Sequence, residues 1–569
     1  MHFFKCDDLQ AWTGGKWHAL NAAAKPDIRG FSIDSRRMEK DFAFVALKAA
    51  RDGHDFAADA VANGATAIMA ERELDVGAPV LVVPDARKAL RRIAKMHRLR
   101  FEWPVIGISG SCGKTSTREM LAKLLSWKNP LVTKDNLNNE LGVPLTLLRI
   151  DTRQNQLAIV EAGVAAPGQM EELAEMIEPD VAIITNVGLN HMEGFAEVGN
   201  VAKEKAKLAA NAAAYGWALF HHNLLSWKAF SELKCRKAVV VPADAPDVKA
   251  DLVFRHSFVD NGETVGIDMS IEGGAEYFFE IRKMSDGMLD NALLAIAAAL
   301  MLGTKEEQIA AKLEEIAPLP MRGSIVERDG KKFYIDCYNA SPTSMKDALA
   351  FFSEASEGAG PKMYVMGGMA ELGLGTHRHH KEIGYNLPHS EGDVAVLVGP
   401  NAEIYKTGML ESQNWREEDI RVFQSTAEAK QAVSDFAGGA VFVKGSRVCE
   451  LEKALPDDIL EALRNPARKP AETPCDGSSK SGGKGGGSPR EKREGSEGER
   501  NGVDEGAEDG ESGGGESENG ENSDGEYGDE YAGEYEGQSE IEDENSDGAE
   551  DGEYGDSDGN GDGDEDERF

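Results

Sequence analysis

One run of residues decides what the middle of this chain can fold into, because it joins an apolar strand to a helix through glycines. Residues 105–109 read VIGIS, 110–116 read GSCGKTS, and the helical pattern TREMLAKLLSW follows. A strand, a glycine turn and a helix N-terminus direct backbone N–H groups and the positive end of the helix dipole to one point. The run therefore predicts a phosphate-binding loop at the edge of a parallel α/β sheet.

The residues of this loop suit a nucleotide. Lys114 is expected to reach the terminal phosphates, and the Thr115 hydroxyl to take a position on Mg²⁺. The full pattern G-x-x-x-x-G-K-[ST] is not met, because Ile108 stands where the first glycine is required. A glycine-rich turn that binds nothing is the alternative interpretation. The candidate nucleotide-binding residues are Gly110, Ser111, Cys112, Gly113, Lys114, Thr115 and Ser116.

Two further strands of this region end in residues that suit a metal site. LAIVEAG (157–163) carries Glu161 near its end, and DVAIITNVG (180–188) is followed by His191. Ligands of open parallel sheets gather at the carboxyl ends of the strands, and carboxylate and hydroxyl oxygens suit Mg²⁺. A solvated glutamate and a structural histidine are the alternatives for each residue alone. Their joint position beside the phosphate loop favours the metal site.

Apolar strands and helical patterns alternate in two series along the chain, which indicates an α/β fold of parallel strands joined by crossover helices. The expected strands are 42–47, 78–84, 105–109, 157–163, 180–188, 333–339, 362–368, 394–399 and 440–446, and the expected helices are 57–65, 89–100, 117–127 and 201–214. Breaks near residues 100 and 317 and the proline-rich run 464–474 predict domains at 1–100, 101–317 and 318–464.

The acidic charge of the chain is concentrated at its end. Of 569 residues, 100 are acidic and 62 are Lys or Arg, a net charge of −38, and residues 471–569 carry −28 of it. That segment has 25 glycines and no Leu, Met or Trp, so it cannot bury enough apolar surface to offset the entropy of ordering it. We expect a disordered acidic tail over 465–569 and no nucleic-acid binding as the main activity.

Residues 556–567 of this tail satisfy the spacing of an EF-hand calcium loop. No apolar helix precedes the match, and such spacing arises by chance in a segment made mostly of Asp, Glu and Gly. Loose binding of cations by the whole tail is the favoured alternative, and a basic partner is a separate candidate ligand of the tail.

The composition also bears on the compartment. No signal peptide is visible at the start, no run of 18 apolar residues occurs, and six cysteines are scattered without a C-x-x-C pair. These features predict a cytoplasmic protein with reduced thiols and no membrane insertion. A monomer is expected.

In combination the motifs resemble those of the Mur ligases, three-domain ATP-dependent enzymes that form amide bonds in bacterial cell-wall synthesis. GSCGKTS is similar to the family's shortened nucleotide loop, TNVGLNHMEGF to the segment that supplies its metal-binding histidine, and Lys205 to the lysine that it carbamylates. Without the family, Lys205 would be interpreted as a solvated helix lysine. The resemblance covers residues 1–460. It implies an N-terminal α/β UDP-binding domain, a central P-loop ATPase domain with a parallel sheet, and a C-terminal Rossmann-like domain.

Four runs are similar to the branch of the family that adds D-alanyl-D-alanine: DNLNNELGVPLTLL (135–148), DCYNASPTSM (336–345), MAELG (369–373) and VKGSR (443–447). Residues 33–56 resemble the segment that receives the UDP-sugar end. The implied substrates are UDP-N-acetylmuramoyl-tripeptide and D-alanyl-D-alanine. The implied substrate-binding residues are Ser32, Asp34, Ser35, Arg36, Asn138, Asn139, Tyr338, Asn339, Lys444, Ser446 and Arg447. For the last three, a turn that carries a solvated basic pair is the alternative.

The resemblance also implies ATP and two Mg²⁺ ions as cofactors. Thr115 and Glu161 would hold one metal, and His191 and carbamylated Lys205 the other. Asn291 would contact adenine, and Arg322 and Asp336 would act on phosphate from the C-terminal domain, which requires domain closure. The sequence departs from the family's motifs in several places: its adenine segment H-N-x-x-N-A appears as G-M-L-D-N-A with Met288 for the first Asn, Gly368 stands where Asp is usual, and Cys337 and Ser341 replace Ser and Asn.

The implied reaction is phosphorylation of a peptide carboxylate by ATP, followed by attack of the dipeptide amine on the acyl-phosphate, with positioning and charge neutralisation as the main sources of catalysis. One alternative is another Mur-fold amino-acid ligase, of the diaminopimelate-adding or folylpolyglutamate synthase type, against which YNASP and NNELGVP argue. The other is a nucleotide-dependent scaffold that uses the acidic tail. Retention of the loop lysine, the metal residues and Lys205 together argues against it.

Overall fold

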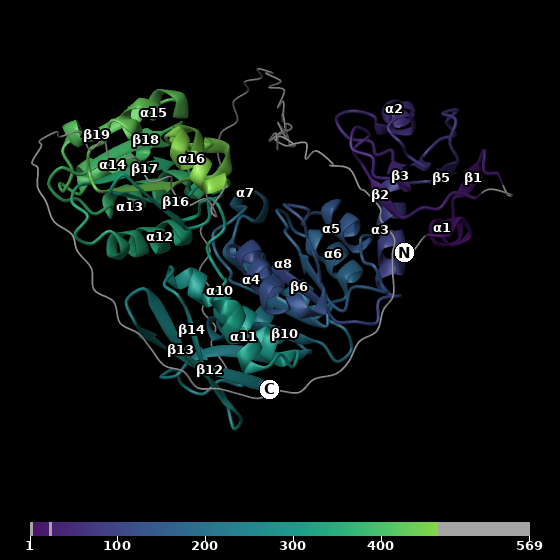
Figure 1. Ribbon diagram of the computed structural model, residues 1–569, viewed down its shortest axis with the longest axis horizontal. Coiled ribbons are helices and arrows are strands. Elements are labelled where there is room, and N and C mark those ends of the chain that lie inside the picture. The colour runs from purple at the N-terminus through teal and green to yellow at the C-terminus, as the bar shows by residue number, and fades with distance from the viewer. Residues whose placement is uncertain (1–3, 22–24, 465–569) are drawn as a thin grey trace, which may run out of the picture. The chain divides into compact units, whose positions relative to one another are not determined.

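The computed structural model describes residues 4–21 and 25–464, and Figure 1 shows their arrangement. These residues form three sheets of five, nine and six strands, each of which lies within one of the three predicted ranges. All thirteen expected strands and helices are present, with ends that differ by a few residues, so the predicted three-part α/β architecture is confirmed. The boundaries at 100, 317 and 464 stay predictions. The expected disorder of the tail and the calcium-type spacing at 556–567 lie outside the described residues.

The N-terminal sheet has the order β1-β5-β4-β3-β2. Its strands are β1 (Lys16–His18), β2 (Gly30–Ser32), β3 (Phe42–Val45), β4 (Ala67–Ala70) and β5 (Val80–Val82), and its helices are α1 (Cys6–Thr13), η1 (Gly53–Phe56), α2 (Ala57–Ala62) and α3 (Ala86–Arg98). Four strands are parallel, and β1 pairs antiparallel with β5. Strand β1 was not predicted, because its three residues contain no apolar run.

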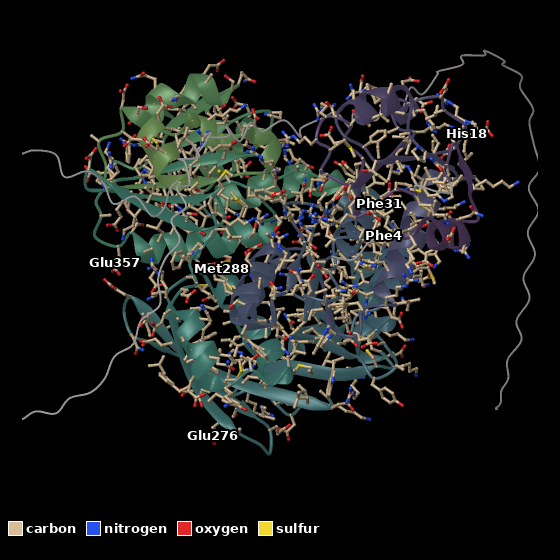
Figure 2. All side chains as sticks on the ribbon, turned by 45° about the vertical axis from the view of Figure 1, so that its right-hand side comes forward. Phe4, His18, Phe31, Glu276, Met288 and Glu357 are labelled. Atoms are coloured by element: carbon tan, nitrogen blue, oxygen red, sulfur yellow. The ribbon has the colours of Figure 1, made fainter. Side chains whose placement is uncertain are left out.

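Helix α3 links the N-terminal part to the central one through a shared core. Asp85 begins the helix by accepting a hydrogen bond from the Lys88 backbone N–H at 2.9 Å. Its apolar stripe packs against α5 (Gly142–Leu147) and α6 (Gln169–Ile177) of the central part. The same core includes Phe4, whose ring lies beside that of Phe31 with centroids 5.2 Å apart (Figure 2). One apolar core therefore contains residues from both sides of residue 100.

The central sheet has the order β14-β13-β12-β11-β10-β9-β6-β8-β7. Its strands are β6 (Val105–Ser109), β7 (Leu131–Val132), β8 (Ala158–Glu161), β9 (Val181–Ile184), β10 (Trp217–His221), β11 (Arg236–Pro242), β12 (Leu252–Asp260), β13 (Thr264–Ile271) and β14 (Glu276–Arg282). Pairing is parallel from β7 to β12 and antiparallel from β12 to β14. The antiparallel part was missed, although Asn261-Gly262 and Gly273-Gly274 are turn signals between its strands.

Helices cover both faces of the central sheet (Figure 1). On one face α4 (Lys114–Leu124) packs along α10 (Asp286–Met301), whose run LLAIAAA (293–299) is buried. Helix α8 (Val198–Ala210) packs against α6 on the other face. The remaining helices of this part are η2 (Ser126–Lys128), α7 (Met192–Phe195), η3 (His222–Ser226), α9 (Lys228–Ser231) and α11 (Glu306–Leu313).

The C-terminal sheet has the order β15-β16-β20-β17-β18-β19. Its strands are β15 (Ser324–Arg328), β16 (Lys331–Asp336), β17 (Lys362–Gly367), β18 (Val394–Val398), β19 (Ile420–Phe423) and β20 (Ala440–Lys444). Only β15 pairs antiparallel. Its helices are α12 (Pro342–Ala355), η4 (Gly373–Gly375), α13 (Thr376–Tyr385), α14 (Ala402–Glu411), η5 (Glu417–Asp419), α15 (Thr426–Ser434), η6 (Arg447–Cys449), η7 (Leu451–Ala454) and α16 (Asp457–Arg464). Within the described part of the chain, no helix has the length and apolar character needed to cross a bilayer.

Arg98, the last residue of α3, provides a test of the shared core. Its guanidinium donates to the carbonyls of Ile177 at 2.9 Å and Glu178 at 2.8 Å. Because Arg98→Ala removes hydrogen bonds from one buried and one partly buried carbonyl, it is expected to lower the free energy of unfolding by about 3 kcal/mol. Arg100→Ala is the matched control, since that arginine is exposed over the Trp12 ring and should contribute less than about 1 kcal/mol. Urea titration followed by tryptophan fluorescence checks both; equal effects would contradict the shared core.

Candidate nucleotide and metal site

The loop after β6 has a backbone path that requires glycine at two positions. Gly113 has a φ of +79°, and a Cβ there would lie 2.2 Å from Asn291 Oδ1. A Cβ at Gly110 would lie 1.8 Å from Thr185 Oγ1. Both glycines are therefore fixed by close neighbours as well as by conformation. Asn291, predicted to contact adenine, lies behind the loop and accepts a hydrogen bond from Thr117 Oγ1 at 3.2 Å.

The segment after β9 holds the loop in place through hydrogen bonds. Thr185 Oγ1 donates to the carbonyl of Cys112 at 2.5 Å, and the Cys112 N–H donates to Asn186 Oδ1 at 2.9 Å. The amide of Asn190 donates to the carbonyl of Ser111 at 3.0 Å. Sequence reasoning missed Thr185 and Asn186, although both directly follow the strand that neighbours β6.

Two lysines converge on one carbonyl of the loop. Lys114 Nζ donates to the carbonyl of Gly110 at 2.8 Å, and Lys205 Nζ, from α8, donates to the same oxygen at 3.0 Å. Lys205 is 1% exposed, so its interpretation as a solvated helix lysine is wrong. Burial, with a contribution from the Lys114 charge, holds the pKa of Lys205 well below its usual value. The loop therefore faces the Lys114 ammonium, which suits an anionic ligand, and a second, buried lysine whose charged form is disfavoured.

Glu161 lies at the end of β8 with its carboxylate held from three sides. Thr115 Oγ1 donates to Oε2 at 3.2 Å, the Asn138 amide donates to Oε1 at 2.8 Å, and Arg118 Nη1 donates to Oε2 at 3.1 Å. The residue is 1% exposed, so the alternative of a solvated glutamate is wrong. The predicted pair Thr115 and Glu161 is thus brought together. Arg118 was missed, although it lies one helical turn after Thr115.

The neighbouring predicted residues have mainly structural contacts. Ser116 is buried in the first turn of α4. Asn139, an expected substrate residue, accepts from the backbone N–H groups of Leu141 and Gly142 and so begins α5. Its substrate role stays a prediction.

His191 contacts a residue of the C-terminal part instead of the other predicted metal residues. Its Nδ1 lies 2.5 Å from Glu371 Oε2, and the N–H of Met192 donates to the Glu371 carbonyl at 2.8 Å. The two paired residues have φ angles of +54° and +61°, which are uncommon for residues other than glycine. Among the described residues, no group of three or more His, Cys, Asp or Glu side chains is arranged to hold a metal by itself, so other oxygens would have to complete a site.

The C-terminal part contributes an arginine and an ion pair. The Arg322 guanidinium lies 3.8 Å from the centre of the Tyr338 ring, and burial lowers its pKa from the usual value, opposed by Tyr338, Glu161 and Asp336. Lys444 is 1% exposed, forms an ion pair with Asp336, and donates to the carbonyl of Asn339 at 3.3 Å. The alternative of a solvated basic pair is therefore wrong for Lys444.

The other expected substrate residues form two local clusters. Ser446 is 2% exposed and accepts from the Ala370 N–H at 2.8 Å, and Arg447 pairs with Glu452. In the N-terminal part, Ser32 Oγ accepts from the Asp34 N–H at 3.1 Å, and Arg36 makes two bonds to the Asp34 carboxylate, at 3.0 and 3.2 Å. The Ser35 carbonyl accepts from Asn63 at 2.9 Å.

The departures from the family's motifs have identifiable surroundings. Met288 packs against the core of the central part (Figure 2), and a Cβ at Gly368 would lie 2.7 Å from Asn401 Nδ2. Cys337 is fully buried. Ser341 caps α12 by accepting from the Ser344 N–H, and its hydroxyl lies 3.3 Å from Cys112 Sγ in the phosphate loop. Helix capping is therefore retained with serine at position 341.

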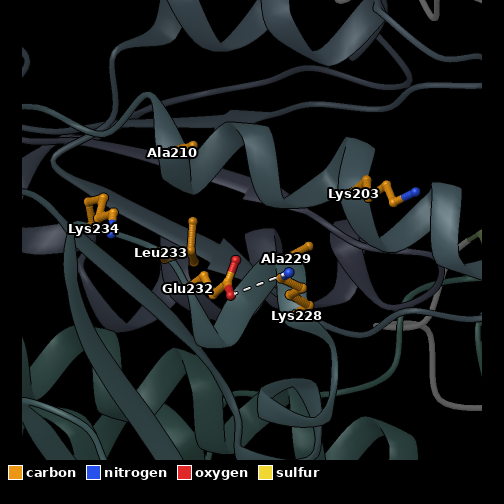
Figure 3. Close-up of a pocket in the computed structure, with 7 residues that line it drawn as sticks. All are labelled: Lys203, Ala210, Lys228, Ala229, Glu232, Leu233 and Lys234. Atoms are coloured by element: carbon orange, nitrogen blue, oxygen red, sulfur yellow. Dashed lines mark ion pairs between the residues drawn. The ribbon is translucent and has the colours of Figure 1, made fainter. Parts of the chain in front are cut away.

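A cavity of about 400 Å³ lies elsewhere on the central part, between α8 and α9 (Figure 3). It is lined by Lys203, Ala210, Lys228, Ala229, Glu232, Leu233 and Lys234. None of the predicted site residues lines it. The five described cysteines are all free, and Cys475 lies outside the described residues.

Comparison with protein families gives three matches in chain order. The Mur ligase family catalytic domain matches residues 27–98, the Mur ligase middle domain matches 108–299, and the Mur ligase glutamate ligase domain matches 321–447. The chain belongs to the Mur ligase family. It is thus an ATP-dependent ligase that forms amide bonds, as the motifs predicted.

Two bacterial relatives of this Mur ligase share a name. The UDP-N-acetylmuramoyl-tripeptide–D-alanyl-D-alanine ligase of Bacillus subtilis strain 168 is 30% identical over 439 residues, which cover 76% of this chain and 93% of that protein. The Escherichia coli K12 ligase of the same name is 29% identical over 430 residues, 74% of this chain and 92% of that protein. A crystal structure of MurF from Acinetobacter baumannii matches 82% of this chain and 99% of that chain, with 27% identity and a TM-score of 0.69.

Gly113 offers a test of the nucleotide loop in this Mur ligase. Gly113→Ala is expected to weaken binding of a non-hydrolysable ATP analogue by more than about tenfold, because the new Cβ would displace Asn291 and the loop. Gly303→Ala is the matched control, since Gly303 also has a positive φ, +76°, but no atom lies within 4 Å of the position that its Cβ would take. It should lower stability by about 1 kcal/mol without changing affinity. Isothermal titration measures the affinities; an equal loss in both variants would contradict the role of the Asn291 contact.

Proposed function

We propose that this Mur ligase joins D-alanyl-D-alanine to UDP-N-acetylmuramoyl-tripeptide in peptidoglycan precursor synthesis, with conversion of ATP to ADP and phosphate. The observation that carries the proposal is the convergence of Lys114 and Lys205 on the phosphate loop beside the Thr115–Glu161 pair. The names of the Bacillus and Escherichia relatives support the choice of substrates. A scaffold that only binds nucleotide would have no need for a buried lysine at this position.

In the proposed reaction, the tripeptide carboxylate attacks the γ-phosphorus of ATP, and ADP leaves. The amine of D-alanyl-D-alanine then attacks the carbonyl carbon of the acyl-phosphate, forms the amide bond and expels inorganic phosphate. Lys114 neutralises charge on the transferred phosphoryl group. The Gly110–Gly113 backbone and the N-terminus of α4 hold the remaining phosphates.

The oxygen set of Thr115 and Glu161 fits Mg²⁺, because both are hard ligands and the carboxylate is already oriented by neighbours. His191 and a carbamate on Lys205 would hold a second ion. Bound magnesium would supply neutralisation of phosphate charge. Arg118 and Asn138 keep the Glu161 carboxylate oriented toward the loop.

Carbamylation of Lys205 is supported by its burial. An uncharged amine attacks CO₂, forms an N–C bond and releases a proton, so the reaction requires the low pKa that burial imposes on this lysine. The product is an anion, which offsets the charge of Lys114 beside the same carbonyl.

Arg322 and the Lys444–Asp336 pair are proposed to act from the C-terminal part after closure. Arg322 stacks on Tyr338 near Glu161, where its charge would contact the phosphoryl group. Lys444 would release Asp336 to bind the dipeptide carboxylate, with Ser446 and Arg447 beside it. Asn291 is proposed to contact adenine. The UDP end of the substrate is proposed to bind Ser32, Asp34, Ser35 and Arg36. The enzyme is proposed to act in the cytoplasm as a monomer.

Phosphate release by the full chain tests the proposed reaction. With ATP and UDP-N-acetylmuramoyl-tripeptide, release should depend on D-alanyl-D-alanine, and free diaminopimelate or glutamate should not replace the dipeptide. Lys114→Ala should reduce the rate by at least about 10²-fold, because one fixed charge on the phosphoryl group is lost. Unchanged turnover in Lys114→Ala, or turnover with a free amino acid instead of the dipeptide, would refute the proposed reaction.

The carbamate can be tested without turnover. In ¹³C-bicarbonate, the protein should show a carbamate carbon signal that disappears in Lys205→Ala. Lys203→Ala is the matched control, because Lys203 lies on the same helix but lines the surface cavity of Figure 3. A signal that persists in Lys205→Ala would contradict modification of this lysine.

A further inference from the structure

Helix α10 is capped by a residue from a different part of the chain. The side chain of its N-cap residue, Ser285, makes no capping hydrogen bond to the helix within the described residues. The backbone N–H of Gly287, in the first turn of the helix, instead donates to Asp347 Oδ1 at 3.0 Å, and Asp347 belongs to α12 of the C-terminal part. We propose that Asp347 is a positioning residue of the nucleotide site, which fixes α10 against the C-terminal part.

The Asp347 carboxylate occupies the space that a side chain at position 287 would need. A Cβ at position 287 would lie 2.9 Å from Asp347 Oδ2 and 3.3 Å from its Cγ. Any side chain at position 287 would therefore displace the carboxylate. The family's adenine segment has a histidine at the position of Gly287, so the glycine in G-M-L-D-N-A makes room for the carboxylate from α12.

Helix α10 transmits this contact to the phosphate loop. Asn291 lies one turn after Gly287, faces Gly113, and accepts a hydrogen bond from Thr117 of α4. A displacement at the start of α10 would move Asn291 away from the loop. The hydrogen bond from Gly287 to Asp347 thus fixes the start of α10 and, through it, the position of Asn291 against the phosphate loop.

The same helix of the C-terminal part contacts the loop directly. Ser341, at the start of α12, lies 3.3 Å from Cys112 Sγ, and Glu354, near its end, pairs with Lys283 at 2.5 Å. Asp347 lies between these two contacts in the sequence. Helix α12 therefore bridges the phosphate loop and α10, and the position of the C-terminal part is coupled to the geometry of the nucleotide site.

This role of Asp347 rests on the proposed nucleotide site, and a double-mutant cycle on the full chain separates the two. Affinity for a non-hydrolysable ATP analogue is measured for Asp347→Ala, Gly287→Ala and the double variant. Asp347→Ala should weaken binding about fivefold, as expected for loss of a helix cap. Gly287→Ala should weaken it by a similar factor because the new methyl group displaces the carboxylate. The double variant should be no weaker than the single ones, because the clash is gone.

Two further variants exclude a purely structural role. Asp347→Asn keeps an acceptor oxygen and should restore affinity to within about twofold of the original chain. Glu354→Ala, on the same helix, removes only a surface ion pair and should change affinity less than about twofold. Fully additive losses in the cycle, or unchanged affinity in Asp347→Ala while Lys114→Ala abolishes binding, would overturn the role of Asp347. Unchanged affinity in Lys114→Ala would instead overturn the nucleotide site itself.

Discussion

The interaction on which the site depends is the convergence of two lysines on the Gly110 carbonyl. Lys114 is local to the loop, whereas Lys205 arrives from α8 on the other face of the sheet and is fully buried. Burial and the nearby charge both disfavour a second ammonium group there. The protein tolerates this arrangement because the region receives negative charge: phosphates against the loop, and a carbamate on Lys205 in the proposed mechanism. Because β6 lies between β8 and β9, the loop after β6, Glu161 and the Thr185 segment meet at the same end of the sheet.

The acidic side of the site is organised separately. Glu161 ends β8 and is held by Thr115 from the loop helix, Asn138 from the segment before α5, and Arg118 from the next turn of α4. Arg118 compensates the charge of a carboxylate that is 1% exposed, which offsets the free-energy cost of burying that charge. The two lysines, from α4 and α8, and the oriented carboxylate at the end of β8 thus lie around the same loop, as binding a metal–nucleotide complex requires.

The parts of the fold and of the site that could be predicted from the sequence are those whose structure depends on residues close together in the chain. Strands such as 105–109 and the loop after them were predictable because apolar runs and glycines act within a few residues. Thr185 and Asn186 were not, since their contacts depend on the pairing of β6 with β9. Arg118 had a local signal, its position one helical turn after Thr115, but its contact with Glu161 depends on the pairing of β6 with β8. The burial of Lys205 had a signal that was overlooked: with Val201 and Leu208 it forms an i, i+4, i+7 stripe on α8.

The glycines that replace family residues show why a motif is an incomplete description of a site. At Gly287 the space is taken by the Asp347 carboxylate, and at Gly368 by the amide of Asn401. At each position the motif's side chain is absent, and a polar group from an element distant in the sequence occupies the space. The polar contact is therefore made by a residue outside the motif. Because Asp347 belongs to α12, its hydrogen bond with Gly287 also connects α10 to the C-terminal part. A histidine within the motif would not make this connection. A departure from a motif should therefore be interpreted from the volume around it before a function is judged lost.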